Sequence, residues 1–178
     1  KVQRSMASVL RKIFAFILLF VNTAIAGEQK DFEDIQKAYK LNSSNKKELV
    51  QKFFKSYPNS IFIPDIRMLV ATSSPTIDES ISEYHKIINK YRYYSKREIA
   101  FLSLCQLYYI KSDWDNLLST CNQALAESST SNYRPIFLQL CAIAHYNFNH
   151  YDEAVKECEK VPNYSRQLHT LAYSLFIK

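Results

Sequence analysis

The sequence predicts an all-α protein built from antiparallel helix pairs, and three observations support this prediction. Only one glycine, Gly27, occurs among the 178 residues. β-Hairpin turns and phosphate-binding loops depend on glycine, so this chain has almost no place for them. Apolar residues after position 30 recur at helical spacing. Some of them also recur at a fixed offset of 36 to 37 residues, which is typical of stacked helical repeats.

Prolines and short polar segments bound the expected helices. Leu49, Phe53 and Tyr57 lie on one face of a helix that ends at Pro58. Pro64 already has the φ angle of a helix start, so another helix is expected directly after it. The helices from there on are expected over residues 65–71, 77–91, 95–110, 113–126, 132–147 and 151–161, with a last one from 165 onward.

The second helices of the pairs carry the most regular repeat. Four sets of residues follow one offset of 37, namely Ile77/Trp114/Tyr151, Ser80/Leu117/Ala154, Tyr84/Cys121/Cys158 and Ile87/Ala124/Val161. In the first helices, the segment 101–105 recurs 36 residues later as 137–141. These offsets predict a stack in which each pair buries its apolar face on its neighbours. An irregular helical bundle is the alternative.

The N-terminal segment has the three parts of a secretory signal. Arg11 and Lys12 precede nine apolar residues, 13–21, and the sequence Ala24-Ile25-Ala26 comes before Gly27. We therefore expect residues 1–26 to be a leader and signal peptide cleaved after Ala26, and residues 27–178 to be the repeat domain. The apolar run is too short to span a bilayer, so the mature form is expected to lack a transmembrane span. A membrane anchor or a buried helix is the alternative interpretation of the run.

The C-terminal end of the sequence also bears on the domain limits. The apolar helical pattern of residues 168–177 runs almost to Lys178. Truncation of the repeat array at this point is therefore one interpretation.

The net charge of +6 does not point to nucleic acid. Lys1, Arg4, Arg11 and Lys12 all precede the expected cleavage site, and no acidic residue does. Removing these four from the 23 basic residues leaves 19 against 17 acidic ones, a net charge of +2. The remaining sequence has no basic stripe with interleaved aromatic residues. Nucleic acid is therefore not an expected partner.

The repeats resemble the tetratricopeptide family. Phe101, Leu104, Cys105 and Tyr108 stand at the W-x-x-L-G-x-x-Y places of that family. The same places are filled again by Leu168, Leu171, Ala172 and Leu175, and a third time by Phe137, Leu140, Cys141 and Ala144. The A-x-x-x-F places read Leu49/Phe53, Ser80/Tyr84, Leu117/Cys121 and Ala154/Cys158. The resemblance covers residues 31–178, and its period exceeds the usual 34 residues.

The tetratricopeptide resemblance implies a right-handed superhelix whose first helices line a concave groove for peptides. Carried over place by place, the groove residues are Arg67, Gln106, Tyr109, His145, Tyr146, Arg166, His169 and Tyr173. Other proteins or peptides are then the expected partners.

One junction resembles a narrower group. Residues 53–60, FFKSYPNS, followed by Pro64-Asp65-Ile66-Arg67, are similar to the helix junction of bacterial periplasmic repeat proteins. That group includes the coordinator associated with the Tol-Pal system and the outer-membrane β-barrel assembly lipoproteins. The cysteine that would carry a lipid is absent here, which favours a soluble periplasmic scaffold. A secreted protein that binds host targets is one alternative, and the repeat portion of an exported enzyme is another.

The four cysteines occupy packing positions of the repeat. Cys105 and Cys141 lie in first helices, and Cys121 and Cys158 lie in second helices. In an exported chain, the bonds Cys105–Cys121 and Cys141–Cys158 would each tie one helix pair together, although four cysteines allow three pairings. The other interpretation is that all four are buried thiols acting as small apolar residues.

No motif for catalysis, a metal or a cofactor emerges. The histidines are His85, His145, His150 and His169, and none belongs to an H-E-x-x-H sequence. His145 and His150 are five residues apart, a poor spacing for one helical face. No nucleophile elbow or Cys-x-x-Cys occurs either. We therefore expect a binding protein and not an enzyme.

Overall fold

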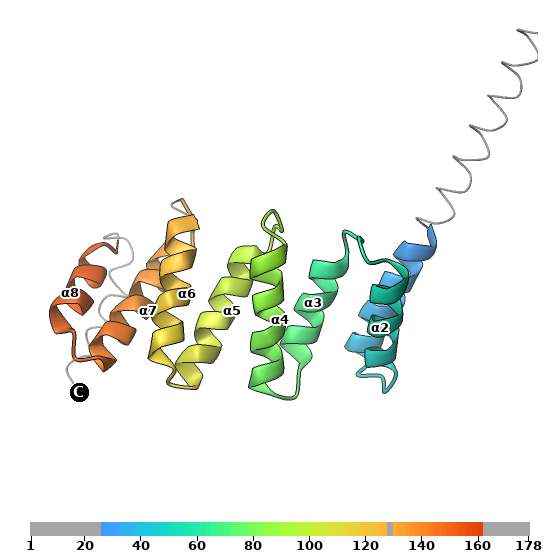
Figure 1. Ribbon diagram of the computed structural model, residues 1–178, viewed down its shortest axis with the longest axis horizontal. Coiled ribbons are helices and arrows are strands. Elements are labelled where there is room, and N and C mark those ends of the chain that lie inside the picture. Colours follow the sequence, from blue (N-terminus) through green and yellow to red (C-terminus); the bar gives the residue numbers. More distant parts are fainter. Residues whose placement is uncertain (1–25, 128–129, 162–178) are drawn as a thin grey trace, which may run out of the picture. The chain divides into compact units, whose positions relative to one another are not determined.

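The computed structural model describes residues 26–127 and 130–161, and within these ranges every regular element is a helix (Figure 1). The helices are a stretch over residues 26–40, α2 (Lys46–Ser56), α3 (Ile63–Ser73), α4 (Ile77–Lys90), α5 (Arg97–Ile110), α6 (Trp114–Glu127), α7 (Arg134–Asn147) and α8 (Tyr151–Glu159). The all-α prediction is confirmed. The expected signal segment before Ala26 and the expected helix from Ser165 lie outside the described residues.

The observed helix bounds differ from the predicted ones by a few residues. Helix α3 begins at Ile63, so Pro64 lies in its first turn and does not precede it. A proline is tolerated there because the first N–H groups of a helix have no partner within it. Helix α5 begins at Arg97, later than Ser95, because the Arg97 N–H closes a turn on the Tyr94 carbonyl at 3.0 Å.

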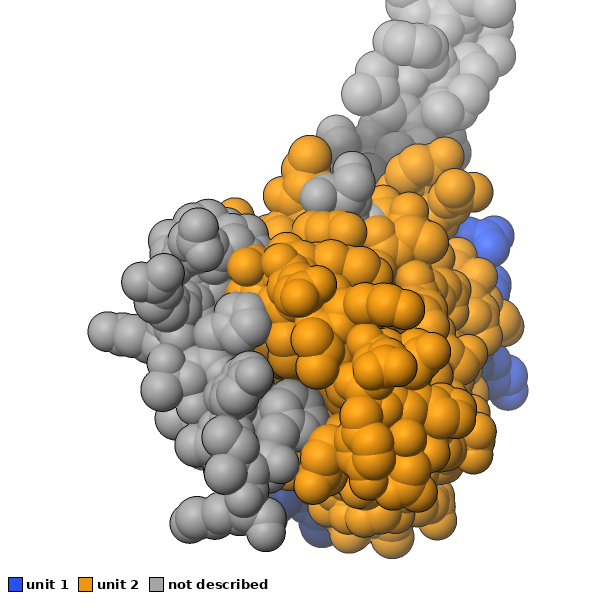
Figure 2. Space-filling model, turned by 90° about the vertical axis from the view of Figure 1, so that its left-hand side faces the viewer, with its two compact units in different colours: residues 1–69 blue, residues 70–178 orange. Residues whose placement is uncertain are grey.

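The chain divides into two compact units, residues 1–69 and 70–178 (Figure 2). Within the described part of the first unit, Phe32 stacks on Phe62 with ring centroids 4.5 Å apart. Phe53 and Ile35 are also buried in this unit, and the Phe53 ring lies 4.9 Å from that of Tyr57. The Tyr57 hydroxyl donates a hydrogen bond to Asp31 at 3.0 Å. A ring stack and a hydrogen bond therefore connect the helical stretch 26–40 with the turn before α3 and with the end of α2.

In the second unit, the helices α4 to α8 pack one on the next in chain order. Short turns join them, so neighbouring helices run antiparallel (Figure 1). The core that they share consists of buried apolar side chains from each helix, among them Tyr84, Ile87, Phe101, Leu104, Leu117, Cys121, Phe137 and Leu138. None of the helices in the described ranges is both long and apolar enough to cross a membrane.

The turns inside the pairs use the left-handed backbone region without glycine. Ser112 has φ 54° and Asn149 has φ 61°. The next N–H in each turn reaches back to close it: Asp113 to the Tyr108 carbonyl and His150 to the His145 carbonyl, both at 2.9 Å. This is the Schellman geometry that normally favours glycine. The two turns share this hydrogen-bond pattern and lie 37 residues apart.

Burial corrects the register predicted for α7. The buried residues Ala100, Phe101, Leu104 and Cys105 of α5 have buried counterparts in Phe137, Leu138, Cys141 and Ala142 of α7. The first helices therefore follow the 37-residue offset as well, one residue later than the predicted 36. Leu140, expected in the core, is only half-buried, whereas Leu138 is 1% exposed. The period is thus the same in both helices of a pair.

Candidate functional site

The structure places the predicted groove residues in both units. Arg67 lies in α3, in the first unit, with its guanidinium 4.8 Å from the centre of the Phe54 ring. Gln106 and Tyr109 lie in α5, and His145 and Tyr146 lie in α7. The remaining three, Arg166, His169 and Tyr173, lie outside the described residues.

Tyr109 and Tyr146 hold equivalent places, and each packs across the turn that follows it. The Tyr109 ring meets the edge of Trp114, the first residue of α6, with centroids 5.9 Å apart and planes at 71°. Tyr146 meets Tyr151, the first residue of α8, in the same way at 5.5 Å and 63°. Each tyrosine therefore supports its own turn. Tyr109 nevertheless remains 43% exposed, with Gln106 exposed one turn before it.

His145 has a different environment from its neighbour Tyr146. It stands at the place of Tyr108 in the preceding pair, and Tyr108 is buried with its hydroxyl 2.7 Å from His85 Nε2. His145 Nδ1 is also buried and has no hydrogen-bond partner in the described part of the chain. Its ring lies 6.1 Å from that of His150. His145 therefore lies at the edge of the core and is only partly exposed.

Sequence reasoning missed Arg97, the first residue of α5. Its Nε and Nη2 donate to the Ile88 carbonyl of α4 at 3.1 and 2.9 Å. The same guanidinium forms an ion pair with Glu127 of α6 and lies 4.9 Å from the centre of the Phe101 ring. Burial lowers the pKa of Arg97, and the nearby positive charge of Arg92 lowers it further. Arg97 thus joins three successive helices.

Arg134, 37 residues after Arg97, repeats part of this arrangement. It is the first residue of α7, and its Nη1 donates to the Leu125 carbonyl at 3.3 Å near the end of α6. Carbonyls in the last turn of a helix have no partner within it and favour a cation. The two arginines at the repeat offset were the sequence signal that could have revealed this junction.

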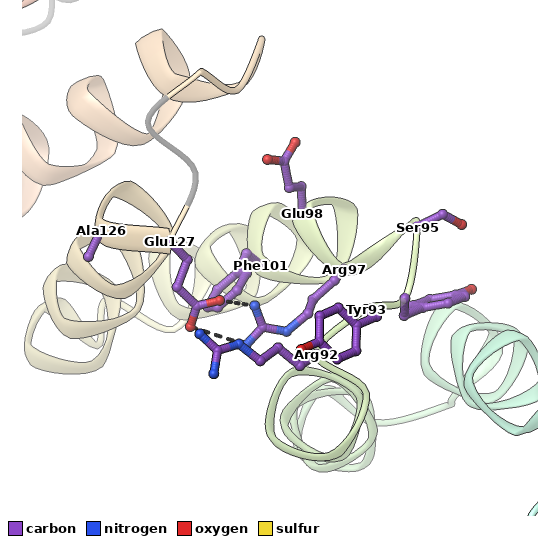
Figure 3. A pocket seen from close by; sticks show the side chains of 9 residues that line it. Arg92, Tyr93, Ser95, Arg97, Glu98, Phe101, Ala126 and Glu127 are labelled. Atoms are coloured by element: carbon purple, nitrogen blue, oxygen red, sulfur yellow. Dashed lines mark hydrogen bonds and ion pairs between the residues drawn. The ribbon is translucent and has the colours of Figure 1, made fainter.

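A pocket of about 490 Å³ opens beside Arg97. Its lining includes Arg92, Tyr93, Ser95, Arg97, Phe101 and Glu127 (Figure 3). The Arg92 side chain extends toward the Arg97–Glu127 ion pair in Figure 3. Tyr93 is 97% exposed at the rim. The pocket therefore brings the Arg92 side chain and the exposed Tyr93 ring next to the Arg97–Glu127 ion pair.

The four cysteines are buried thiols in α5, α6, α7 and α8. Across residues 26–127 and 130–161, no three or more histidine, cysteine, aspartate or glutamate side chains gather closely enough to hold a metal ion.

Comparison with models of known protein families finds no match, and neither characterised proteins nor solved structures match the chain. The helices of the described residues and their 37-residue repeat define the class as an all-helical protein with a repeated helix pair.

Proposed function

We propose that this protein is an exported scaffold of the tetratricopeptide kind, which binds segments of other cell-envelope proteins in the periplasm. The signal-like segment that ends at Ala26 supports export. The junction at residues 53–67 supports a periplasmic partner of the Tol-Pal or outer-membrane assembly type, through the resemblance described above. Catalysis forms no part of this proposal.

The equivalent places of Tyr109 and Tyr146 carry the proposal. A row of tyrosines at one repeat offset offers apolar ring surface together with a polar hydroxyl end, a combination that is common in protein interfaces. Because their rings are fixed by Trp114 and Tyr151, little side-chain entropy is lost when a peptide binds. Gln106 adds an exposed amide on the same helical face as Tyr109.

The pocket beside Arg97 adds a charge preference to the proposed binding. Glu127 already pairs with Arg97, whereas Arg92 is exposed and contributes a second positive charge next to it. Arginine pairs well with carboxylates because its planar group donates two parallel hydrogen bonds. We therefore propose that Arg92 receives an acidic side chain of the bound segment, with the Tyr93 ring beside it.

Photocrosslinking in the cell that makes the protein tests this proposal. A photoreactive phenylalanine replaces Tyr109, where it keeps a ring against Trp114, or replaces Tyr93. The matched control carries it at Ser119, an exposed position on α6. We expect the same envelope protein to be captured from positions 93 and 109 and not from 119. Equal capture at all three positions, or capture at none of them, would contradict the proposal.

A further inference from the structure

Two of the buried thiols lie in direct contact. Cys105 of α5 and Cys121 of α6 have their Sγ atoms 3.2 Å apart, and both residues are 0% exposed. A disulfide bond is about 2 Å long and joins Cβ atoms about 4 Å apart. A displacement of about 1 Å, shared between two side chains, is therefore enough to bring the sulfurs to bonding distance.

The next helix pair lacks this arrangement. At the 37-residue offset the counterpart of Cys121 is Cys158, and the counterpart of Cys105 is Ala142. Cys158 indeed packs with Ala142 and Ala154 in one buried cluster. Cys141 stands one residue before Ala142 and has its Sγ 3.7 Å from Asn122 Oδ1 of α6. The expected pair Cys141–Cys158 thus does not occupy the places that Cys105 and Cys121 occupy.

We propose that the mature protein carries a single disulfide, Cys105–Cys121, which ties α5 to α6, while Cys141 and Cys158 remain thiols. In forming it, the two thiols lose two protons and two electrons as their sulfurs bond. The electrons pass to a disulfide oxidant, such as oxidised glutathione or a protein disulfide, which becomes two thiols. The proposal depends on the proposed export only for the compartment that supplies this oxidant.

The burial of the pair determines when the bond forms. Hydrogen bonding with Cys105 and Cys141, together with burial, raises the pKa of the Cys121 thiol. Thiolate is the reactive species in exchange, so the folded and reduced protein reacts slowly. Oxidation therefore takes place before α5 and α6 close on each other, and the finished bond is shielded from reductants.

Refolding in a glutathione redox buffer tests the proposal without any binding partner. The thiols that remain are then counted with a chromogenic disulfide reagent in denaturant. We expect the reagent to count two free thiols, because the other two of the four cysteines have formed the disulfide. Mass spectrometry after cleavage at lysine, arginine and glutamate should find Cys105 linked to Cys121. The oxidised protein should melt roughly 5 to 10 °C above the reduced one. Four free thiols, or a bond that includes Cys141 or Cys158, would overturn the proposal.

Three substitutions sharpen this test. Cys141→Ala should leave the bond intact, and Cys105→Ala should abolish it. Ala142→Cys places a thiol opposite Cys158 and should create a second bond between these two helices. The matched control is Ile143→Cys, one residue further along α7, which should not form that bond. If the Ala142→Cys protein forms no bond to Cys158 under the same conditions, then positions 142 and 158 are not equivalent to positions 105 and 121. That result would contradict the proposal. Because no readout involves a partner, this outcome is independent of peptide binding.

Discussion

Arg97, the first residue of α5, donates two hydrogen bonds to the main-chain carbonyl of Ile88 near the end of α4, from Nε at 3.1 Å and from Nη2 at 2.9 Å. The last carbonyls of a helix have no hydrogen-bond donor within the helix, and the Arg97 guanidinium supplies one to Ile88. Since Arg134 and Leu125 repeat the contact, the junction between successive helix pairs has a defined chemistry.

Arg97→Ala should lower the free energy of unfolding by about 2 kcal/mol, because it removes the hydrogen bonds to the Ile88 carbonyl and the ion pair with Glu127. Arg134→Ala is the matched variant and should cost about 1 kcal/mol, since its one bond is longer at 3.3 Å. Urea unfolding followed by circular dichroism measures both values. Equal losses of unfolding free energy in the two variants would show that the additional contacts of Arg97 do not stabilise the protein.

Ser112→Gly should raise the free energy of unfolding by about 0.5 to 1 kcal/mol, because Ser112 adopts φ 54°, a conformation that costs glycine nothing. Asn149→Gly should change stability much less, because asparagine tolerates this region well. The same urea titration applies to both. A destabilised Ser112→Gly protein would mean that the serine side chain matters more than its backbone conformation.

Tyr108 should make the protein less stable at high pH. Burial raises the pKa of Tyr108 above its ordinary value of 10.0, with smaller contributions from Asp113 and Cys105. The unfolded chain then releases this proton first, so the stabilisation is complete below the ordinary pKa and falls as pH rises beyond it toward the folded value. Unfolding of the native sequence and of Tyr108→Phe is compared at about pH 9 and about pH 11. The variant should lose less stability between them, and an equal loss would contradict the assignment.

Arg92→Ala should reduce crosslinking of the envelope partner from position 109 about tenfold, the effect of losing one charged hydrogen bond. Lys90→Ala is the control, because it removes the same charge from an exposed residue at the end of α4 that does not line the pocket. Quantitative immunoblotting of the crosslinked band measures the yield. Similar yields from the two variants would assign the effect to net charge and not to the pocket.

Export should produce a mature chain that begins at Gly27, because the small residues Ala24 and Ala26 precede it. Mass spectrometry of the N-terminal peptide from the periplasmic fraction identifies this end. Ala26→Phe should block cleavage and leave the longer form associated with membranes. A protein found at full length in the cytoplasm would contradict the proposed export.

The helices were predictable because their signals are local. Proline positions and apolar spacing located each described helix after residue 60 to within a few residues, as for α4, predicted over 77–91 and observed as Ile77–Lys90. The pocket at Arg92 and Arg97 was not predictable in this way. Its residues lie in the turn after α4, at the start of α5 and at the end of α6, and only packing brings them together.

The sequence by itself determined the all-α class and the repeat near 37 residues, because helical periodicity and helix-ending residues act within one segment of chain. Only the tertiary structure decided which face of α7 is buried and therefore which thiols meet. A shift of one residue turns a helical side chain by about 100° around the axis. That rotation places Ala142 opposite Cys158, where the offset predicted from the sequence placed Cys141.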